Sequence, residues 1–587
     1  MNILNVVIDD KEIQVPEGTT IMQAADKIGS HVPRLCYHPI LSTEGACRIC
    51  IVEVEGMNNF TTSCNTKIQE GMKIKTNSTA LMQARRDLVE LLLDNHPRAC
   101  LTCDRNGNCE LQNLAYKLGV RDRLFAGVRK RIPIERDNIA IVRDAEKCIL
   151  CYRCVRVCSE VQGIANLSQL YRGFNTVVAP AFEAKMDDSV CIMCGQCINV
   201  CPTGALEEKS HTEQVLAALN DPTKHVVVQT APAIRVTIAE GWYDEVGINA
   251  TGKTVEALRR LGFDAVFDTN FGADLTIIEE SNEFLSRLEK GENLPILTSC
   301  SPGWINFMEH FYPEFIPNAS TCKSPMQMTS TLIKTYYAQQ KGLDPKDIYV
   351  VAIMPCIAKK YEASRPEHFS EEGYPYTDAV LTTRELIWMI KAMGIDFKNL
   401  PQNSEFDDPL GESTGAAVIF GTTGGVMEAT LRTAYFKLTG KKPKELEYTE
   451  VRAVEGLKEA SIEIDGKTIN VAVANGLSNA KAILDKVKSG EKQYHIIELM
   501  ACPGGCVAGG GQPLPNASEY VYPLDSDMIK KRQAALYQID KEEQVRVSAE
   551  NQSIKKLYKN FLKKPGSEIA HKLLHTHYSE KYPRGVK

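Results

Sequence analysis

Alternating and helical patterns of apolar residues divide the first part of the chain into blocks of different character. In residues 1–78, short alternating stretches at 2–8, 12–15 and 51–54 predict the strands of a small β-rich domain. In residues 79–138, apolar residues recur at three- and four-residue spacing through ALMQARRDLVELLLDNH. This spacing predicts a helical block after the strands.

The pattern changes again in the rest of the chain. Residues 139–209 contain two similar cysteine runs, which indicate a duplicated module. In residues 210–587, the apolar runs HVVVQTAPAIR, AVFDT, LPILTSC, IYVVAIMPC, AVIFGTTGG and YHIIELMAC alternate with helical patterns, and most end in a Cys or Gly turn. This alternation predicts an α/β multidomain protein with functional residues at the strand ends. The tail, residues 515–587, is polar, lacks cysteine and is expected to be helical.

Length and composition narrow the class of protein. A chain of 587 residues is too long for one hydrophobic core, so several domains are expected. The net charge of −6 gives no electrostatic footprint for nucleic acid, and no apolar run is long enough to span a membrane. The N-terminus lacks the form of a secretory signal, so a cytoplasmic protein is expected. Cysteines in that compartment favour metal binding over disulfides.

Twenty cysteines are present, and nineteen of them belong to spaced groups. In the first group, Cys36, Cys47, Cys50 and Cys64 are separated by ten, two and thirteen residues. Plant-type ferredoxins bind a [2Fe–2S] cluster through a closely related pattern with a tighter first gap. A structural zinc site is the alternative. The β-rich context favours the [2Fe–2S] cluster in a β-grasp, ferredoxin-like domain.

The second group combines one imidazole with three thiols. His96, Cys100, Cys103 and Cys109 are separated by three, two and five residues. A zinc ion or a [4Fe–4S] cluster would suit this set equally well on its own. Its position between two iron–sulfur modules favours the cluster. A neutral imidazole in place of a thiolate makes a cluster less negative and should raise its reduction potential.

Two further runs share one spacing: Cys148, Cys151, Cys154 and Cys158, then Cys191, Cys194, Cys197 and Cys201. In bacterial two-cluster ferredoxins, the fourth cysteine of each run ligates the cluster of the other run. We therefore expect Cys201 to join the first three cysteines around one [4Fe–4S] cluster, and Cys158 to join Cys191, Cys194 and Cys197 around another. Paired zinc sites do not need this crossed spacing.

Three distant segments place cysteine in Gly- or Pro-rich turns after apolar strands: TSCSPGW (298–304), MPCIAKKYE (354–362) and ELMACPGGCVAGGGQP (498–513). These segments resemble the signature motifs of [FeFe]-hydrogenases, and the resemblance covers essentially the whole chain. The order of the N-terminal modules is similar to that of clostridial-type [FeFe]-hydrogenases and of the catalytic subunits of multimeric, electron-bifurcating NAD(P)-linked hydrogenases.

The resemblance implies an H-cluster in the C-terminal block. This group is a [4Fe–4S] cubane bridged by a cysteine sulfur to a two-iron centre that carries CO, cyanide and a dithiolate. Cys356, Cys502 and Cys506 match three of its four protein ligands, and Cys506 matches the bridging position. In total, the chain is expected to bind one [2Fe–2S] cluster, three [4Fe–4S] clusters and one H-cluster.

Three further residues match positions around that cluster. Lys359 matches the residue that pairs with a cyanide ligand, where a charged donor in a dry site is strongly favourable. Met354 and Met500 match residues that pack against the two-iron centre, although both would suit a plain apolar core equally well.

The first motif departs from the family pattern. Most members have two adjacent cysteines, the first in proton relay and the second as a cubane ligand, whereas this chain has Cys300 followed by Ser301. Alignment puts Ser301 at the ligand position. Thiolate is the better match for iron–sulfur coordination, which favours Cys300 as the ligand. Ligation by a Ser301 alkoxide and an altered cubane are the other two interpretations.

The rest of the family's proton relay has matches in this chain. They are Glu280, Ser320 and Glu283, with Arg287 near the exit. Carboxylates with a hydroxyl between them can pass protons if each is within hydrogen-bond reach. Cys322 belongs to no group and is expected to be a small buried apolar residue.

The implied reaction is the reversible conversion of H2 into protons and electrons. The chain contains no GxGxxG after a strand and no phosphate-binding loop, so flavin and NAD(P) should bind to other subunits. We favour a hydrogenase subunit whose partner subunits carry flavin, NAD(P) and further [2Fe–2S] clusters; a stand-alone ferredoxin hydrogenase is the alternative. An iron–sulfur scaffold or a hydrogen sensor is disfavoured by the relay glutamates, the full set of clusters and the lack of a signalling domain.

Overall fold

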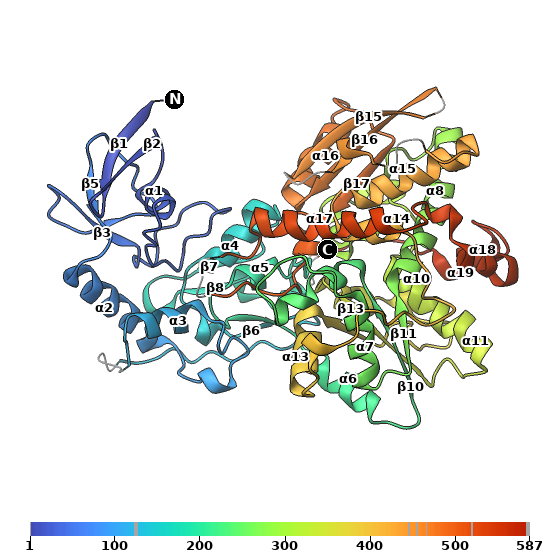
Figure 1. Cartoon of the computed structure of the whole chain (residues 1–587), viewed down its shortest axis with the longest axis horizontal. Coiled ribbons are helices and arrows are strands. Elements are labelled where there is room, and N and C mark those ends of the chain that lie inside the picture. The colour runs from blue at the N-terminus through green and yellow to red at the C-terminus, as the bar shows by residue number, and fades with distance from the viewer. Residues whose placement is uncertain are drawn as a thin grey trace.

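Figure 1 shows the computed structural model, which describes residues 2–121, 127–443, 447–452, 456–464, 466–517 and 521–582. The N-terminal sheet lies at one end of the molecule, and the large α/β part forms the other end (Figure 1). Short helices and ladders lie between them. The expected multidomain architecture with mixed helices and strands is confirmed.

The N-terminal sheet has five strands in the order β2-β1-β5-β3-β4. They are β1 (Ile3–Ile8), β2 (Lys11–Pro16), β3 (Ile51–Val54), β4 (Thr61–Thr62) and β5 (Lys73–Lys75). β1 pairs antiparallel with β2 and parallel with β5. Helix α1 (Ile21–Lys27) begins with a capping box between Thr20 and Gln23 and buries its apolar face on the sheet.

The helical block is shorter than the sequence pattern predicts. Helix α2 (Thr79–Asn95) and helix α3 (Glu110–Lys117) pack against each other around Val89, Leu111 and Leu114. In contrast, residues 127–138 contain no helix. This stretch alternates charged residues with isolated apolar ones around a proline, which cannot donate a helical hydrogen bond.

The duplicated module is built from short elements. Strand β6 (Ile141–Arg143) pairs with β9 (Leu206–Glu208), and β7 (Ser168–Leu170) pairs with β8 (Val177–Ala179), both antiparallel. Helices α4 (Arg153–Arg156) and α5 (Gln196–Val200) lie within the two cysteine runs, contain Cys154 and Cys197, and contact each other.

The large part contains two four-stranded sheets. The first is all parallel, in the order β11-β10-β13-β14, and consists of β10 (His225–Thr230), β11 (Ala265–Asp268), β13 (Ile348–Met354) and β14 (Ala379–Thr382). The second has the order β12-β17-β16-β15 and consists of β12 (Ile296–Leu297), β15 (Leu457–Ile464), β16 (Lys467–Asn475) and β17 (Ile496–Met500). In the second sheet, only β15 is antiparallel to its neighbour.

Helices surround both sheets. The 22-residue helix α8 (Thr269–Lys290) follows β11, begins at the Asp268 cap and is buried over most of its length. It contacts α10 (Pro325–Leu332) and α15 (Gly425–Thr439). Because β12, β13 and β17 each end just before the first cysteine of one of the three motifs, the sheets bring these motifs together at their carboxyl ends.

The apolar run AVIFGTTGG and the polar tail both contain helices. AVIFGTTGG forms the helix α14 (Gly415–Val418) and a tight turn instead of a strand, because a short apolar run also suits a buried helix. The tail is helical as expected, with α17 (Ser526–Glu542), α18 (Gln552–Leu557) and α19 (Glu568–Leu574). Figure 1 shows α17 crossing the large part beside α14. No helix within the described residues is long and apolar enough to cross a bilayer.

Candidate functional site

The first cysteine group lies in loops beside the N-terminal sheet. Cys36, Cys50 and Cys64 are buried, and Cys47 is partly exposed. The backbone amide of Cys36 lies 3.4 Å from the sulfur of Cys47, and a side-chain hydrogen bond with Cys47 lowers the pKa of the Cys36 thiol. A similar pairing with Cys64 lowers the pKa of Cys50. The four predicted side chains are therefore brought together as two close pairs.

The second group lines a cavity of ≈ 20 Å³ between α2 and α3. His96, Cys100, Cys103 and Cys109 all border it. Burial lowers the pKa of His96 to about 4, so its imidazole is neutral at neutral pH. Its buried Nδ1 atom has no hydrogen-bond partner among the described residues. A neutral, unpartnered imidazole beside three thiols suits metal binding.

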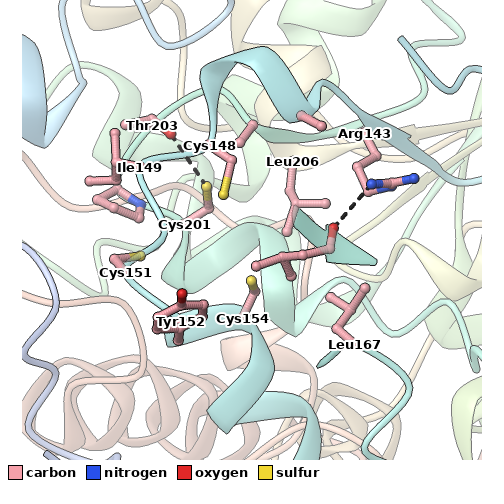
Figure 2. Close-up of a pocket in the computed structure, with 14 residues that line it drawn as sticks. Arg143, Cys148, Ile149, Cys151, Tyr152, Cys154, Leu167, Cys201, Thr203 and Leu206 are labelled. Carbon is pink, nitrogen blue, oxygen red and sulfur yellow. Dashed lines mark hydrogen bonds between the residues drawn. The ribbon is translucent and has the colours of Figure 1, made fainter. Parts of the chain in front are cut away.

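The two repeated runs cross as their spacing suggests. Cys148, Cys151 and Cys154 border one cavity together with Cys201 from the second run (Figure 2). Cys191, Cys194 and Cys197 border another cavity together with Cys158 from the first run. The Thr203 hydroxyl lies 3.8 Å from the sulfur of Cys201, and a dashed line marks this contact in Figure 2.

The spacing of the ligand atoms distinguishes clusters from single ions. Four ligands of a tetrahedral zinc lie within about 4 Å of one another, because each metal–ligand bond is only about 2.0–2.3 Å. Within the described part of the chain, the only group of three or more His, Cys, Asp or Glu side chains with all ligand atoms within 4.8 Å contains Glu283, Cys322 and His575. The five predicted sets are therefore wider than a single ion requires, and they fit polynuclear clusters.

The three C-terminal motifs meet in a cavity of ≈ 80 Å³. Its lining includes every predicted cluster residue from these motifs: Cys300, Ser301, Met354, Cys356, Lys359, Met500, Cys502 and Cys506. Burial raises the pKa of the Cys506 thiol to about 12 and also raises the pKa of Cys356. Such thiols stay protonated until a metal replaces the proton. The thiol donors and the volume of the cavity both fit the H-cluster.

Two glycines shape the turn between the last two cysteines. Gly505 has a φ of +91°, and a Cβ at this position would lie 2.5 Å from the backbone nitrogen of Thr423. Gly504 has a φ of +77°, and a Cβ there would lie 2.5 Å from the side chain of Ile529. Only glycine fits both positions without strain, so the turn can bring Cys502 and Cys506 to one cavity.

Cys300 and Ser301 point to different neighbours. Cys300 packs beside Met500 and α8, and its thiol pKa is raised by burial and by the nearby Glu280 carboxylate. Ser301 precedes the first residue of α9 (Pro302–Phe311), and its Oγ accepts a hydrogen bond of 3.3 Å from the amide of Ala501. The serine hydroxyl therefore lies beside the residue that precedes Cys502.

Lys359 is a buried cation at the edge of the cavity. Its Nζ donates to Glu362 at 2.6 Å and to the carbonyl oxygen of Cys300 at 3.2 Å. The Glu362 carboxylate and the Cys300 carbonyl oxygen thus hold the lysine side chain in place. This arrangement leaves its third N–H available to an anionic ligand in the cavity.

The predicted relay residues form a connected set on α8 and in the loop before α10. Ser320 Oγ donates to Glu283 at 3.0 Å, and Glu283 pairs with Arg287 at 2.5 Å. Ser320 also interacts with Glu280. Burial, and next the neighbouring Glu283, raise the pKa of Glu280 to about 8. One oxygen of Glu280 has no hydrogen-bond partner among the described residues.

Sequence reasoning missed several residues around the cavity. Glu498 lies in β17, accepts N–H bonds from Gly424 and Met427 at 2.6 and 2.7 Å, and has a pKa raised to about 7 by burial. A lone carboxylate inside the apolar run YHIIELMAC was a signal for it. Gln196 interacts with Cys502 and donates to the carbonyl of Ala508, and no local pattern signals that role.

A shared residue and a pair of hydrogen bonds connect the separate cluster sites. Cys194 borders both its own cavity and the large one. Between the first cysteine group and the first crossed set, one guanidinium nitrogen of Arg156 donates to the carbonyl oxygens of Cys36 and Cys151, at 2.7 and 3.1 Å. The cysteine groups thus form a continuous series from the N-terminal sheet to the large cavity.

Family comparisons match the chain in five segments. The descriptions are "2Fe-2S iron-sulfur cluster binding domain" for residues 2–79, "NADH-ubiquinone oxidoreductase-G iron-sulfur binding region" for 85–123, "NADH-quinone oxidoreductase subunit 3, ferredoxin-like domain" for 139–207, "Iron only hydrogenase large subunit, C-terminal domain" for 224–510 and "Iron hydrogenase small subunit" for 526–581.

Individual relatives match over nearly the full length. The chain is 48% identical to the NADP-reducing hydrogenase subunit HndD of Solidesulfovibrio fructosivorans, over 98% of this chain and 99% of that protein. It is 42% identical to iron hydrogenase 1 of Clostridium pasteurianum, over 98% of this chain and 100% of that protein. A solved structure of a variant apo [FeFe]-hydrogenase HydA1 from Chlamydomonas reinhardtii is 45% identical, with a TM-score of 0.57, and covers 63% of this chain and 99% of its own.

Proposed function

The chain belongs to the large-subunit family of iron-only, or [FeFe], hydrogenases and is an oxidoreductase that acts on H2; we propose that it is the hydrogenase subunit of an NAD(P)-linked complex. Hydrogen chemistry is supported most directly by the meeting of three cysteine motifs at one cavity, with a buried set of relay residues on the Cys300 side of it. A scaffold for cluster assembly would need no such relay.

We propose that the chain binds one [2Fe–2S] cluster, three [4Fe–4S] clusters and an H-cluster. The [2Fe–2S] cluster would be held by Cys36, Cys47, Cys50 and Cys64, and the histidine-ligated [4Fe–4S] cluster by His96, Cys100, Cys103 and Cys109. The two crossed sets would hold the other [4Fe–4S] clusters. About 20 iron atoms per chain are then expected by elemental analysis. The width of every set supports this assignment over single zinc ions.

In the large cavity, Cys356, Cys502 and Cys506 would hold the H-cluster together with one residue of the first motif. When bound, this group supplies the iron centre at which H2 is split or formed. The chain's own residues orient it and exclude water. Lys359 offers an N–H to an anionic ligand, while the buried thioethers of Met354 and Met500 fill space without competing as hard ligands.

Protons would move between the cavity and the exterior along α8. Cys300 lies on the Glu280 side of the cavity, Ser320 lies beside both glutamates, and Arg287 lies at the far side of Glu283. A protonated Glu280 can donate to Ser320 while Ser320 donates to Glu283, which gives one direction for proton transfer. The neighbours of Cys300 support a relay role for it, with Ser301 at the cubane-ligand position. This differs from the ligand role for Cys300 that the sequence favoured.

Electrons would enter or leave through the N-terminal clusters. Cys194 borders the large cavity, so the cluster held with Cys158 is the nearest to the H-cluster site. The other crossed cluster follows, and Arg156 connects it to the [2Fe–2S] loop through backbone carbonyls. A long series of clusters suits exchange of electrons with partner subunits.

The partners are proposed from the relatives. A similar chain is named as a subunit of an NADP-reducing hydrogenase, and we infer flavin- and NAD(P)-binding partner subunits with further [2Fe–2S] clusters, ferredoxin as a second electron carrier, and a cytoplasmic location. The alternative is a stand-alone ferredoxin hydrogenase. It is supported by the equally complete match to iron hydrogenase 1.

Two measurements test the proposal. Infrared spectra of the matured chain should contain bands of bound CO and cyanide, and their absence would indicate a scaffold protein. The isolated chain should evolve H2 with an artificial reductant but should not reduce NAD(P)+. Addition of the flavoprotein partners should couple the two reactions. Nucleotide reduction by the isolated chain would contradict the assignment of that site to other subunits.

A further inference from the structure

Three side chains from distant segments meet next to the proton relay. Glu283 extends from α8, Cys322 lies in the loop after Ser320, and His575 follows α19. One ligand atom from each lies within 4.8 Å of the other two, and the sulfur of Cys322 lies 3.9 Å from an oxygen of Glu283. Cys322 is the one cysteine that no cluster group uses.

The backbone holds the cysteine and the histidine opposite each other. Cys322 and His575 form an isolated antiparallel bridge. Hydrogen bonds from Lys323 to the carbonyl of Leu574 at 2.8 Å, and from Thr576 to the carbonyl of Thr321 at 2.7 Å, fix it on both sides. The spacing of the two side chains is therefore set by the fold.

A carboxylate behind the histidine orients its ring. His575 Nε2 lies 3.3 Å from an oxygen of Glu279, which also accepts a hydrogen bond of 2.9 Å from the amide of Gly566. Metal-binding histidines commonly have this second carboxylate, which fixes the tautomer and raises the basicity of the other nitrogen. The other nitrogen, Nδ1, faces the Thr321 hydroxyl at 2.7 Å.

We propose that Glu283, Cys322 and His575 form a binding site for a soft divalent cation such as Zn²⁺, and that the bound cation stops proton transfer through Glu283. The second half rests on the relay role proposed above for Glu283. Sulfur, nitrogen and oxygen together suit Zn²⁺ and do not suit Mg²⁺ or Ca²⁺, which prefer oxygen alone.

The charges are consistent with a cation at this position. The side chains of Glu283 and His575 are 13% and 6% exposed, and Cys322 is fully buried. Burial, and then the three glutamates around it, raise the pKa of the Cys322 thiol. Binding would replace the thiol proton, which leaves for solvent, so that thiolate and carboxylate together balance the two positive charges.

The site can accept the ion with small changes. Arg287 donates to one oxygen of Glu283. The other oxygen faces Cys322 and also accepts hydrogen bonds from the Ser320 hydroxyl at 3.0 Å and the Thr321 amide at 3.1 Å, so a bound ion would compete with the Ser320 contact. The Thr321 hydroxyl contacts both Glu283 and His575, so it must rotate out or become the fourth ligand. A tetrahedral site with three protein ligands and one exchangeable position is typical of a reversible zinc site.

The test uses the matured enzyme under anaerobic conditions, cleared of loose metal with a chelator and then treated with one equivalent of ZnCl2. Zinc retained after desalting is measured together with iron, and zinc-edge X-ray absorption identifies its neighbours. We expect about one zinc with one sulfur and two or three N or O ligands. H2 evolution should fall by about 10²–10⁴-fold, as for a lost proton transfer. The infrared bands should stay unchanged.

The variants separate the site from its effect. Cys322→Ala and His575→Gln, made independently, should each bind zinc more weakly by about 10–100-fold or more, and Glu279→Gln by about 10–100-fold. His571→Gln is the matched control, because the His571 ring stacks on His575 at 4.5 Å but offers no ligand to the site. It should bind zinc as the wild type does.

Equal zinc retention in the wild type and in both ligand variants would overturn the site, as would a zinc without sulfur. A zinc that needs Cys322 and His575 but leaves turnover unchanged would support the site and contradict the relay role of Glu283. The infrared bands report on the hydrogenase assignment separately, so failure of the zinc site and failure of the proposed function have different signatures.

Discussion

Cys194 and Gly510 are in direct backbone contact: a Cβ on Gly510 would lie 2.4 Å from the carbonyl oxygen of Cys194. The first residue belongs to the crossed cluster nearest the large cavity, and the second to the glycine run after Cys506. This contact brings the proposed last [4Fe–4S] site against the proposed H-cluster site. The φ of Gly510 is not in the left-handed region, so glycine is needed here because the two backbones approach closely and leave no room for a Cβ.

Gly510→Ala should therefore disturb the junction between two cluster sites. A real Cβ is essentially never found below 3.0 Å from a backbone atom, so the Cys194 loop must move. Overpacking of this kind costs about 1–3 kcal/mol or more. We expect a lower melting temperature and slower H2 evolution with an artificial electron donor.

Gly127→Ala is the matched control for that variant. Among the residues that the structure describes, a Cβ on Gly127 would meet only a side-chain oxygen of Asp94, at 3.2 Å, and this atom can move aside. Its melting temperature and turnover should stay close to those of the wild type. If Gly510→Ala behaves in the same way, the two backbones are farther apart than this structure has them.

The histidine of the second group gives a prediction about redox potential. His96→Cys replaces a neutral ligand by a thiolate, which makes the cluster more negative. Its reduction potential should fall, by an amount on the order of 100 mV. Redox titration followed by electron paramagnetic resonance measures it, and the other clusters in the same sample serve as controls. An unchanged potential would show that His96 is not a ligand.

Glu280 gives a prediction about stability and pH. Its pKa is raised to about 8, so the folded state keeps it protonated at pH values where the unfolded chain ionises it. The unfolded state then binds fewer protons, and this group reduces stability as pH rises from the model-peptide range near 4.3 to about 8. Below that range its contribution is neutral.

Glu280→Gln removes this pH-dependent loss because the amide resembles the protonated acid. Relative to the wild type, the variant should gain about 2 kcal/mol between pH 6 and pH 8. Thermal unfolding at both pH values measures the difference. Glu289→Gln, at an exposed position on the same helix, is the control. A constant gap between Glu280→Gln and wild type at both pH values would argue against a protonated Glu280.

Local spacing was enough to group most of the cysteines. Cys148, Cys151 and Cys154 are close in sequence, and the crossed pattern of the duplicated module leads Cys201 to their cavity. Resemblance to a family supplied the relay on α8, where i, i+3 and i+7 spacing puts Glu280, Glu283 and Arg287 on one face.

Contacts between distant segments could not be predicted. His575 reaches Cys322 through a β-bridge between residues more than 250 positions apart, and nothing local to the tail signals this. AVIFGTTGG formed a helix because its length and apolar content fit a buried helix as well as a strand. The sequence showed Glu498 as a charged residue inside a strand, but it did not show its partner, the backbone amide of Met427 in α15.

The first motif gives the last prediction. A relay thiol and a cubane ligand fail differently when removed: loss of a ligand disrupts assembly, whereas loss of a proton donor leaves the cluster and slows turnover by about 10²–10⁴-fold. Cys300 lies on the Glu280 side of the cavity, and Ser301 lies against the Ala501 amide beside Cys502.

We therefore expect Cys300→Ala to keep its CO and cyanide bands and cubane signal while it loses most of its turnover. Ser301→Ala should assemble the cubane poorly, and Ser301→Cys should restore it, because thiolate is the better ligand for iron–sulfur clusters. Infrared and electron paramagnetic resonance spectra with activity in the same samples separate the cases. A Cys300→Ala enzyme without a normal H-cluster spectrum would instead make Cys300 the ligand, and Ser301 would then have no part in coordination.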